Sequence, residues 1–198
     1  MNKILISFLV CLTVSIAQPV FAQVQTFMSY NIRYNNPNDG VNKWDERKDE
    51  LVALINNYEP LVFGIQEGLL DQVQYIRDQS GVYDYSGVGR DDGKDKGEFA
   101  AIFYNKQELT LLTEGTFWLS ETPEKVSKDW DAALPRICSY AQFKINDSGK
   151  TFWFFNAHFD HIGKVARANS ATLIVQKIKE IAGSASPVIL TGDFNATP

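Results

Sequence analysis

One pattern occurs twice in this chain: a strand-like run, a helix-like run with an apolar face, and a second, more apolar strand-like run. The first copy, residues 24–67, opens with VQTFMSYNIR and closes with LVFGIQE. The second copy, residues 150–195, opens with KTFWFFNAHFD and closes with PVILTGDFN. The alternation between helical and strand periodicity predicts a strand–helix–strand unit near each end of the chain.

Four further strand-like runs lie between the two copies, joined by polar turns: YDYSGVG, EFAAIFYN, LTLLTEGTFWLS and ICSYAQFKI. Two connecting segments, residues 89–98 and 120–136, are long enough to be functional loops. The predicted fold class is α/β in the broad sense (α+β), a four-layer α-β-β-α sandwich of two mostly antiparallel sheets flanked by helices.

We expect each of the two predicted helices, residues 44–60 and 164–183, to bury one apolar face against a sheet. The expected faces carry Leu51, Leu54, Ile55 and Tyr58 in the first helix, and Val165, Ala168, Val175, Ile178 and Ala182 in the second.

The first 22 residues have the pattern of a secretory signal peptide. A short basic start precedes an apolar run from Ile4 to Ala17, and Val20 and Ala22 stand at the two small-residue positions of a cleavage site. A transmembrane anchor is the alternative, but this apolar run is shorter than the ~20 residues that a spanning helix needs. We therefore predict cleavage after Ala22, no membrane span, a single mature domain of residues 23–198, and a periplasmic or secreted protein.

Charge and cysteine content limit the partners of this chain. Its 19 Lys and Arg against 24 Asp and Glu give a net charge of −5, which argues against holding long nucleic acid by counterion release alone. A metal-dependent phosphoesterase stays open, since a bound metal supplies local positive charge. Because Cys11 lies in the predicted signal peptide, Cys138 has no partner for a disulfide, and its alternating context predicts a buried strand residue.

Four polar side chains stand at equivalent places in the two copies. Asn31 and His158 end the strand that leads into a helix, whereas Glu67 and Asp193 end the strand that leaves one. Each alone is well explained as a turn residue, a helix cap or a satisfied polar side chain. Because the carboxyl ends of strands form the ligand crevice in α/β sheets, their joint occurrence predicts that they converge on one site.

Five motifs occur in this order along the chain: MSYNIR, IQEG, GEFAAIFY, NAHFDH and LTGDFNA. In these motifs the chain resembles the endonuclease/exonuclease/phosphatase superfamily, which has the deoxyribonuclease-I-like fold. The resemblance covers residues 26–197. The resemblance implies that Glu67 binds a metal and that Asn31 is its neighbour in the metal shell. Oxygen ligands of this kind suit Mg²⁺, with Mn²⁺ as the alternative. It also implies that His158 contacts the phosphate and that Glu98 is its carboxylate partner, which would orient the imidazole and favour its charged form.

The resemblance assigns catalytic roles to Asp193 and Asn195. The acid would orient the attacking water or the metal shell, and the amide would donate to the phosphoryl group. Two residues apart in an extended chain, their side chains would leave on the same face. Arg136 resembles an arginine that binds the substrate phosphate, with a solvated loop arginine as the alternative.

Three further residues carry weaker signals. Arg90 stands in a loop with charges of both signs and is equally explained as a solvated side chain. Asp160 and His161 follow the NAHF motif and could support the site from behind, although a helix cap or a local turn explains Asp160 equally well.

The family pattern continues after GDFN to a second acid and a closing Ser-Asp-His, for which this sequence has no counterpart, so we expect a C-terminally truncated member whose sandwich is incomplete there. The implied function is an exported Mg²⁺-dependent phosphoesterase that uses direct attack of water. Its substrate class is open among nucleic acid, a phosphorylated sugar or inositol, and a phospholipid head group; the acidic balance and the loop aromatics Trp118 and Trp130 favour the smaller or lipid phosphates. We expect a monomer. The alternative is a catalytically incomplete fragment that binds metal or phosphate without turnover.

Overall fold

The computed structural model describes residues 25–196, which contain eight strands, three α-helices and one 3₁₀ turn. The predicted signal peptide lies outside the described residues. The elements are β1 (Phe27–Asn31), η1 (Gly40–Asn42), α1 (Trp44–Tyr58), β2 (Val62–Gln66), α2 (Leu70–Ser80), β3 (Tyr83–Ser86), β4 (Ile102–Asn105), β5 (Leu109–Trp118), β6 (Ile137–Ile145), β7 (Thr151–His158), α3 (Lys164–Ala182) and β8 (Val188–Asp193).

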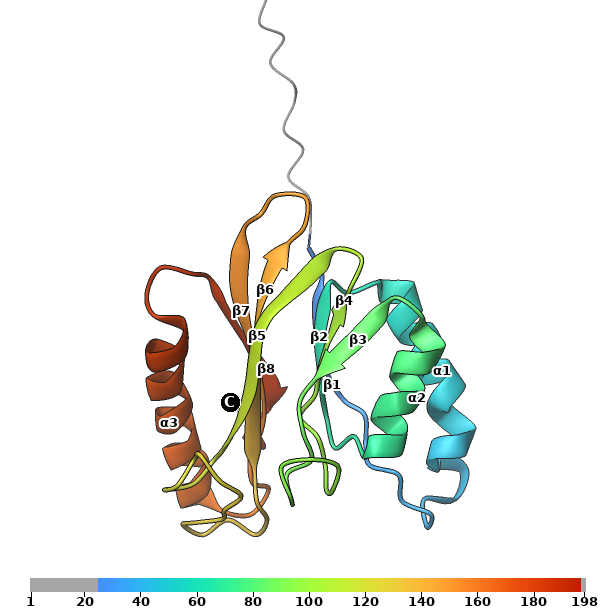
Figure 1. Cartoon of the computed structure of the whole chain (residues 1–198). Coiled ribbons are helices and arrows are strands. Elements are labelled where there is room, and N and C mark those ends of the chain that lie inside the picture. The colour runs from blue at the N-terminus through green and yellow to red at the C-terminus, as the bar shows by residue number, and fades with distance from the viewer. Residues whose placement is uncertain (1–24, 197–198) are drawn as a thin grey trace, which may run out of the picture.

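The strands form two four-stranded sheets, in the orders β1-β2-β4-β3 and β5-β6-β7-β8. Each sheet holds one parallel pair, β1 with β2 and β7 with β8, and its other pairs are antiparallel. The sheets face each other, with α1 and α2 outside one and α3 outside the other (Figure 1). The predicted four-layer α-β-β-α sandwich of mostly antiparallel sheets is thus confirmed.

Apolar side chains fill the three spaces between these four layers. Because side chains alternate along a strand, Phe152 and Phe154 of β7 enter the layer between the sheets, while Trp153 and Phe155 pack toward α3. Cys138 of β6 belongs to the α3 layer and is fully buried, as predicted. Within residues 25–196, no helix is both long and apolar enough to cross a membrane.

The helices differ from the sequence prediction in two ways. The prediction lacked α2, whose buried positions include the polar Gln72 and Ser80, so its apolar periodicity is weak. Gln72 also starts this helix, because its side-chain oxygen accepts the Leu69 backbone N–H at 3.1 Å.

The predicted buried faces of the other helices were partly wrong. Leu51 and Ile55 of α1 are buried as expected, but Leu54 and Tyr58 are exposed because α1 turns Trp44 and Val52 inward instead. In α3, Val165, Ala168 and Val175 face solvent. Ile178 and Ala182 pack toward the sheet as expected, and the rest of the contact comes from Ala166, Ser170, Leu173, Ile174 and Ile181.

Candidate active site

The two parallel strand pairs bring the four predicted strand-end residues to one edge of the sandwich. Asn31 ends β1 opposite Gln66, the residue before Glu67, and His158 ends β7 opposite Asp193. The edge strands β1 and β8 come from different sheets and pack against each other. The ends of all four strands therefore face the same rim, as the sequence pattern predicts.

Asn31 joins the two halves of this rim. Its amide nitrogen donates to Glu67 Oε1 and to Asp193 Oδ2, each at 2.9 Å, although these carboxylates belong to different sheets. Burial raises the pKa of Asp193, but hydrogen bonds from Asn31 and from the Asn195 backbone N–H outweigh burial and hold that pKa below its usual range. Asp193 is therefore a charged carboxylate at neutral pH.

The donor atoms on this rim fit a hard divalent cation. Glu67 and Asp193 offer carboxylate oxygens, which are the ligands that Mg²⁺ takes in small numbers while it keeps several waters, whereas Asn31 turns its amide nitrogen to both carboxylates and its oxygen accepts the Arg33 N–H. Within residues 25–196 no group of three or more His, Cys, Asp or Glu side chains is placed to hold a metal. The assignment of Glu67 and Asn31 to an Mg²⁺ or Mn²⁺ site stays a prediction.

Three strand ends on the rim are followed by residues in the left-handed backbone region. Arg33, Glu67 and Asn195 have φ of 55°, 66° and 47°. For a residue other than glycine, this conformation costs about 1–3 kcal/mol and persists only where surrounding contacts impose it. Here the contacts are visible: the Arg33 N–H donates to Asn31 Oδ1 at 3.0 Å and the Tyr34 N–H to Glu67 Oε2 at 3.1 Å. These two contacts of the turns hold the side chains of Asn31 and Glu67 on the rim.

The expectation that Asp193 and Asn195 project from an extended chain is wrong. The strand ends at Asp193, whose Oδ1 accepts the backbone N–H of Asn195 at 3.0 Å, and this contact turns the chain. The Asn195 amide nitrogen donates to the carbonyl of Phe159 at 2.9 Å, so it links the end of β8 to the residue after β7. Both side chains still line one open hollow of ≈ 700 Å³, together with Asn31.

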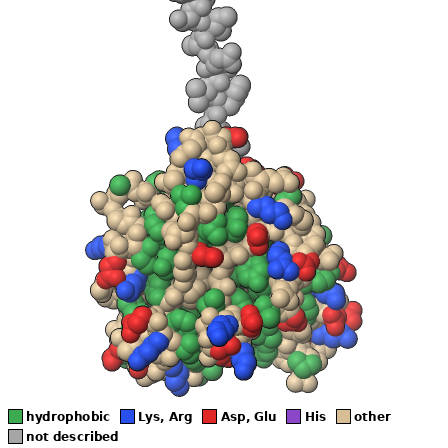
Figure 2. All heavy atoms as spheres, viewed as in Figure 1, with side chains coloured by type: hydrophobic (Ala, Val, Ile, Leu, Met, Phe, Trp, Pro, Cys, Tyr) green, Lys and Arg blue, Asp and Glu red, His purple; other side chains and the backbone are tan. Residues whose placement is uncertain are grey.

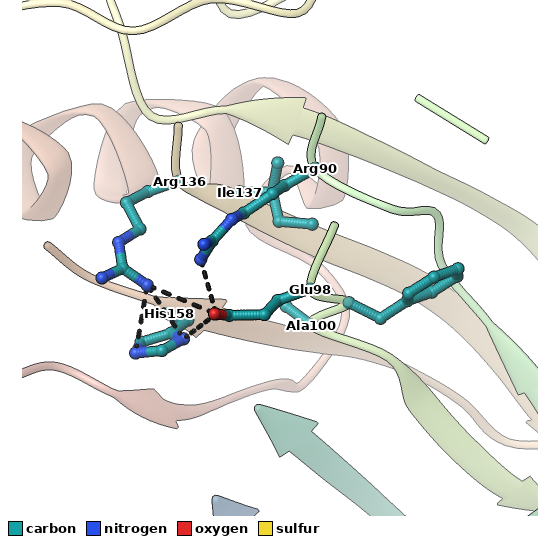
Figure 3. A pocket seen from close by; sticks show the side chains of 7 residues that line it. Arg90, Glu98, Ala100, Arg136, Ile137 and His158 are labelled. Carbon is teal, nitrogen blue, oxygen red and sulfur yellow. Dashed lines mark hydrogen bonds and ion pairs between the residues drawn. The ribbon is translucent and has the colours of Figure 1, made fainter. Parts of the chain in front are cut away.

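A second group of site residues lies beside this rim, where Glu98, Arg136 and His158 come together with Arg90 (Figure 3). Glu98 Oε2 lies 2.5 Å from Arg90 Nη1, 3.7 Å from Arg136 Nη1 and 3.6 Å from His158 Nδ1. The family resemblance implies the pairing of Glu98 with His158 and a place for Arg136 near the phosphate. Arg90, which it could equally explain as a solvated loop residue, is buried among them.

His158 is neutral, contrary to expectation. Burial, followed by the positive charge of Arg136, lowers its pKa to about 3. Arg136 Nη1 lies 3.1 Å from Nδ1 and 3.2 Å from Nε2, and an atom equally near both ring nitrogens stands over the ring face, where a guanidinium stacks. Glu98 does not keep the imidazole charged, because its nearest partner is the Arg90 guanidinium.

Asp160 holds the loop that carries Arg136. Its two oxygens accept the backbone N–H groups of Ile162, Gly163, Ala133 and Leu134, and Oδ2 also lies 3.4 Å from Arg136 Nε. Burial raises the pKa of this carboxyl, but the four N–H groups outweigh it and hold the pKa well below its usual range. Asp160 is thus a structural support. His161 is exposed, with Nδ1 at 3.0 Å from Arg136 Nη2.

A buried polar network beneath the rim was missing from the prediction. Asn156 accepts hydrogen bonds from Gln66 Nε2 at 2.7 Å and Thr191 Oγ1 at 3.2 Å, and it donates to the carbonyls of Ile65 and Ala101 at 2.7 and 3.0 Å. It therefore ties β2, β7 and β8, which end in site residues, to the start of β4. The signal was a polar residue inside each of the apolar runs LVFGIQE and KTFWFFNAHFD.

The sequence profile of the endonuclease/exonuclease/phosphatase family matches residues 28–198. The chain belongs to this family. Family members are hydrolases that act on phosphoester bonds. A mannosyl-6-phosphatase of Bacteroides thetaiotaomicron is 47% identical, with a TM-score of 0.86, over 88% of this chain and 67% of that protein.

Two other relatives agree with the family assignment. An endonuclease/exonuclease/phosphatase family protein of Bacteroides thetaiotaomicron is 48% identical, with a TM-score of 0.84, over 86% of this chain and 63% of that chain. An uncharacterized protein of Acanthamoeba polyphaga mimivirus is 32% identical over 78% of this chain and 60% of its own length. The chain thus spans about three fifths to two thirds of the length of these relatives.

Proposed function

We propose that this chain belongs to an exported, Mg²⁺-dependent phosphatase that removes phosphate from phosphorylated sugars. The observation that carries the proposal is its 47% identity to a mannosyl-6-phosphatase over 88% of the chain, with an acid–amide rim at the strand ends. That protein's substrate class is one of those that the sequence analysis left open.

In this proposal each side chain of the rim has a chemical task. Glu67 and Asn31 hold the metal, which when bound stabilises charge on the phosphoryl and leaving oxygens. Asp193, charged at neutral pH, orients the attacking water by accepting a hydrogen bond from it. Asn195 donates its amide to the phosphoryl group, once that amide has left the Phe159 carbonyl.

The second group of residues binds the phosphate. The Arg136 guanidinium presents N–H groups in a planar fork that matches phosphate oxygens. The neutral imidazole of His158 donates from one ring nitrogen, and its low pKa leaves the positive charge with the neighbouring arginines. Glu98 holds this arginine cluster in place.

Net charge supports a small substrate over nucleic acid. The face in Figure 2 carries Lys and Arg side chains interspersed with Asp and Glu, without a continuous positive stripe. Nucleic-acid-binding surfaces gather positive charge along one face, since phosphate contacts dominate their affinity. The net charge of −5 agrees with this preference.

The test is hydrolysis of mannose 6-phosphate, an inositol phosphate, bis-p-nitrophenyl phosphate, plasmid DNA and sphingomyelin by the full chain, with Mg²⁺ or with EDTA. We expect Mg²⁺-dependent release of phosphate from mannose 6-phosphate, lost in Glu67→Gln and kept in Glu114→Gln, an exposed strand position. Faster cleavage of DNA or sphingomyelin would overturn the substrate assignment. Binding of phosphate and metal without turnover of any substrate would support the non-catalytic alternative instead.

Export is proposed from the pattern of residues 1–22. Its test is expression in a bacterial host, followed by fractionation and N-terminal sequencing. A periplasmic or secreted product that begins at Gln23 is the expected result. A cytoplasmic product that keeps Met1 would contradict it.

A further inference from the structure

Arg90 is fixed in place although it lies in a charged loop. Its backbone N–H donates to the Glu98 carbonyl at 3.2 Å, and its own carbonyl accepts the indole N–H of Trp118 at 2.8 Å. Its side chain is 9% exposed. A side chain buried to this degree, on a backbone held from both directions, is part of the site and not a solvated loop residue.

The Arg90 guanidinium has more donors than the protein supplies with acceptors. A guanidinium carries five N–H groups, and among the described residues the hydrogen bond that Arg90 makes goes to Glu98. Its buried Nε has no hydrogen-bond partner there, and an oxygen of the half-exposed Asp91 lies 3.7 Å from it. A buried charged donor without an acceptor is costly, so this unpaired N–H asks for an explanation.

The neighbouring side chains leave few hydrogen-bond acceptors for the Arg90 guanidinium. Arg136 turns its guanidinium toward the carboxylate that Arg90 uses (Figure 3). The other nearby acid, Asp160, accepts four backbone N–H groups and Arg136 Nε at 3.4 Å, so its oxygens are already used. The side chains of Arg90 and Arg136 are 9% and 5% exposed. Their guanidinium groups thus share Glu98, beside the rim that carries Asp193 and Glu67. An anion with several oxygens would supply the acceptors that Glu98 alone does not.

We propose that Arg90 is a second phosphate-binding residue, which acts with Arg136, and that this arginine pair makes the site selective for phosphate monoesters over diesters. A monoester carries close to two negative charges above its second pKa of about 6 and offers three free oxygens. A diester carries one charge and two free oxygens, so it uses fewer of the arginine N–H groups. This inference rests on the proposed function and names the phosphate class for the same site.

Binding of methyl phosphate and of dimethyl phosphate to the full chain at pH 8 with EDTA, followed by NMR, tests the inference without turnover. We expect methyl phosphate to bind more tightly. The Arg90→Gln substitution should lower the affinity of the chain for methyl phosphate by about 10-fold or more, the usual loss for a charge-assisted hydrogen bond. It should also reduce the preference for methyl phosphate over dimethyl phosphate. Arg90→Lys, which keeps the charge but not the fork, recovers part of it.

Arg77→Gln is the matched control, because it removes the same charge at an exposed position paired with Asp78. It should leave both affinities unchanged. If Arg90→Gln folds and keeps the full preference for methyl phosphate, the inference is wrong. Should Arg90→Gln fail to fold, the Nε–H resonance of Arg90 in the unmutated chain decides: a shift on adding methyl phosphate supports the proposal, and no shift overturns it.

These results are separable from those of the proposed function. Mg²⁺-dependent release of phosphate from mannose 6-phosphate with no effect of Arg90→Gln on monoester preference would refute the arginine pair and keep the function. Monoester binding that depends on Arg90, without turnover of any substrate, would refute the function and keep the arginine pair.

Discussion

Replacing Asn156 by alanine should destabilise the protein strongly, because this side chain joins the strands on which the site is built. Asn156 is fully buried and makes four hydrogen bonds, two donated to carbonyls and two accepted from Gln66 and Thr191. At about 0.5–1.5 kcal/mol for each net hydrogen bond, Asn156→Ala should lower the free energy of unfolding by about 2–6 kcal/mol. Domains of this kind have about 5–15 kcal/mol in total.

The assay is urea unfolding followed by circular dichroism, with Asn146→Ala as the control. Asn146 also uses both ends of its amide, to Thr110 and to the carbonyl of Gln107, but it is exposed, so water can replace its partners. The control should lose less than about 1 kcal/mol. A loss of the same small size in Asn156→Ala would refute the argument that this network holds the two sheets in register.

Three further predictions concern the supports of the site. Gly64→Ala should destabilise the fold by about 1–3 kcal/mol in urea unfolding, since a Cβ there would lie 2.4 Å from Asn156 Cγ; a neutral effect would show that the network yields easily. The pKa of His158 is about 3 in the folded protein and 6.5 for an ordinary histidine, so between these pH values the unfolded chain binds a proton that the folded chain does not. The free energy of unfolding should therefore fall as the pH drops from 6.5 toward 3. His158→Asn should flatten that slope in unfolding at pH 7 and pH 5, and an unchanged slope would contradict the neutral imidazole. Asp160→Asn should loosen the loop that carries Arg136 and speed amide exchange at Ala133, whose N–H loses a charged acceptor; unchanged exchange would contradict its supporting role.

The layers of the fold were predictable because their cause is local. Alternation along a strand decides which side chains enter which layer, as Phe154 and Phe155 show on opposite faces of β7. Each strand–helix–strand unit that the sequence predicts forms one parallel pair, β1 with β2 and β7 with β8. These pairs placed Asn31, Glu67, His158 and Asp193 on one rim, which the structure shows.

Other features depend on contacts between distant segments, which periodicity does not contain. Helix α2 has no Ser, Thr, Asp or Asn cap. Its start is stabilised instead by the Gln72 side chain, which accepts the backbone N–H of Leu69. The turn at Asn195 follows from its contacts with Asp193 and Phe159. The neutral state of His158 depends on burial and on the nearby Arg136, and Arg90 is buried beside Glu98. These contacts join segments that are distant in the sequence, so hydrophobic periodicity does not predict them.

We propose that Glu67 and Asn31, joined to Asp193 at one rim, hold a divalent cation. The most direct test of this proposal is Mn²⁺ binding to the full chain, measured by electron paramagnetic resonance, in the unmutated protein, Glu67→Gln and Glu114→Gln. The account predicts that Glu67→Gln weakens Mn²⁺ binding by about 10-fold or more, as expected for losing a charged oxygen ligand, while Glu114→Gln leaves it unchanged. Equal Mn²⁺ affinity in all three proteins would contradict it.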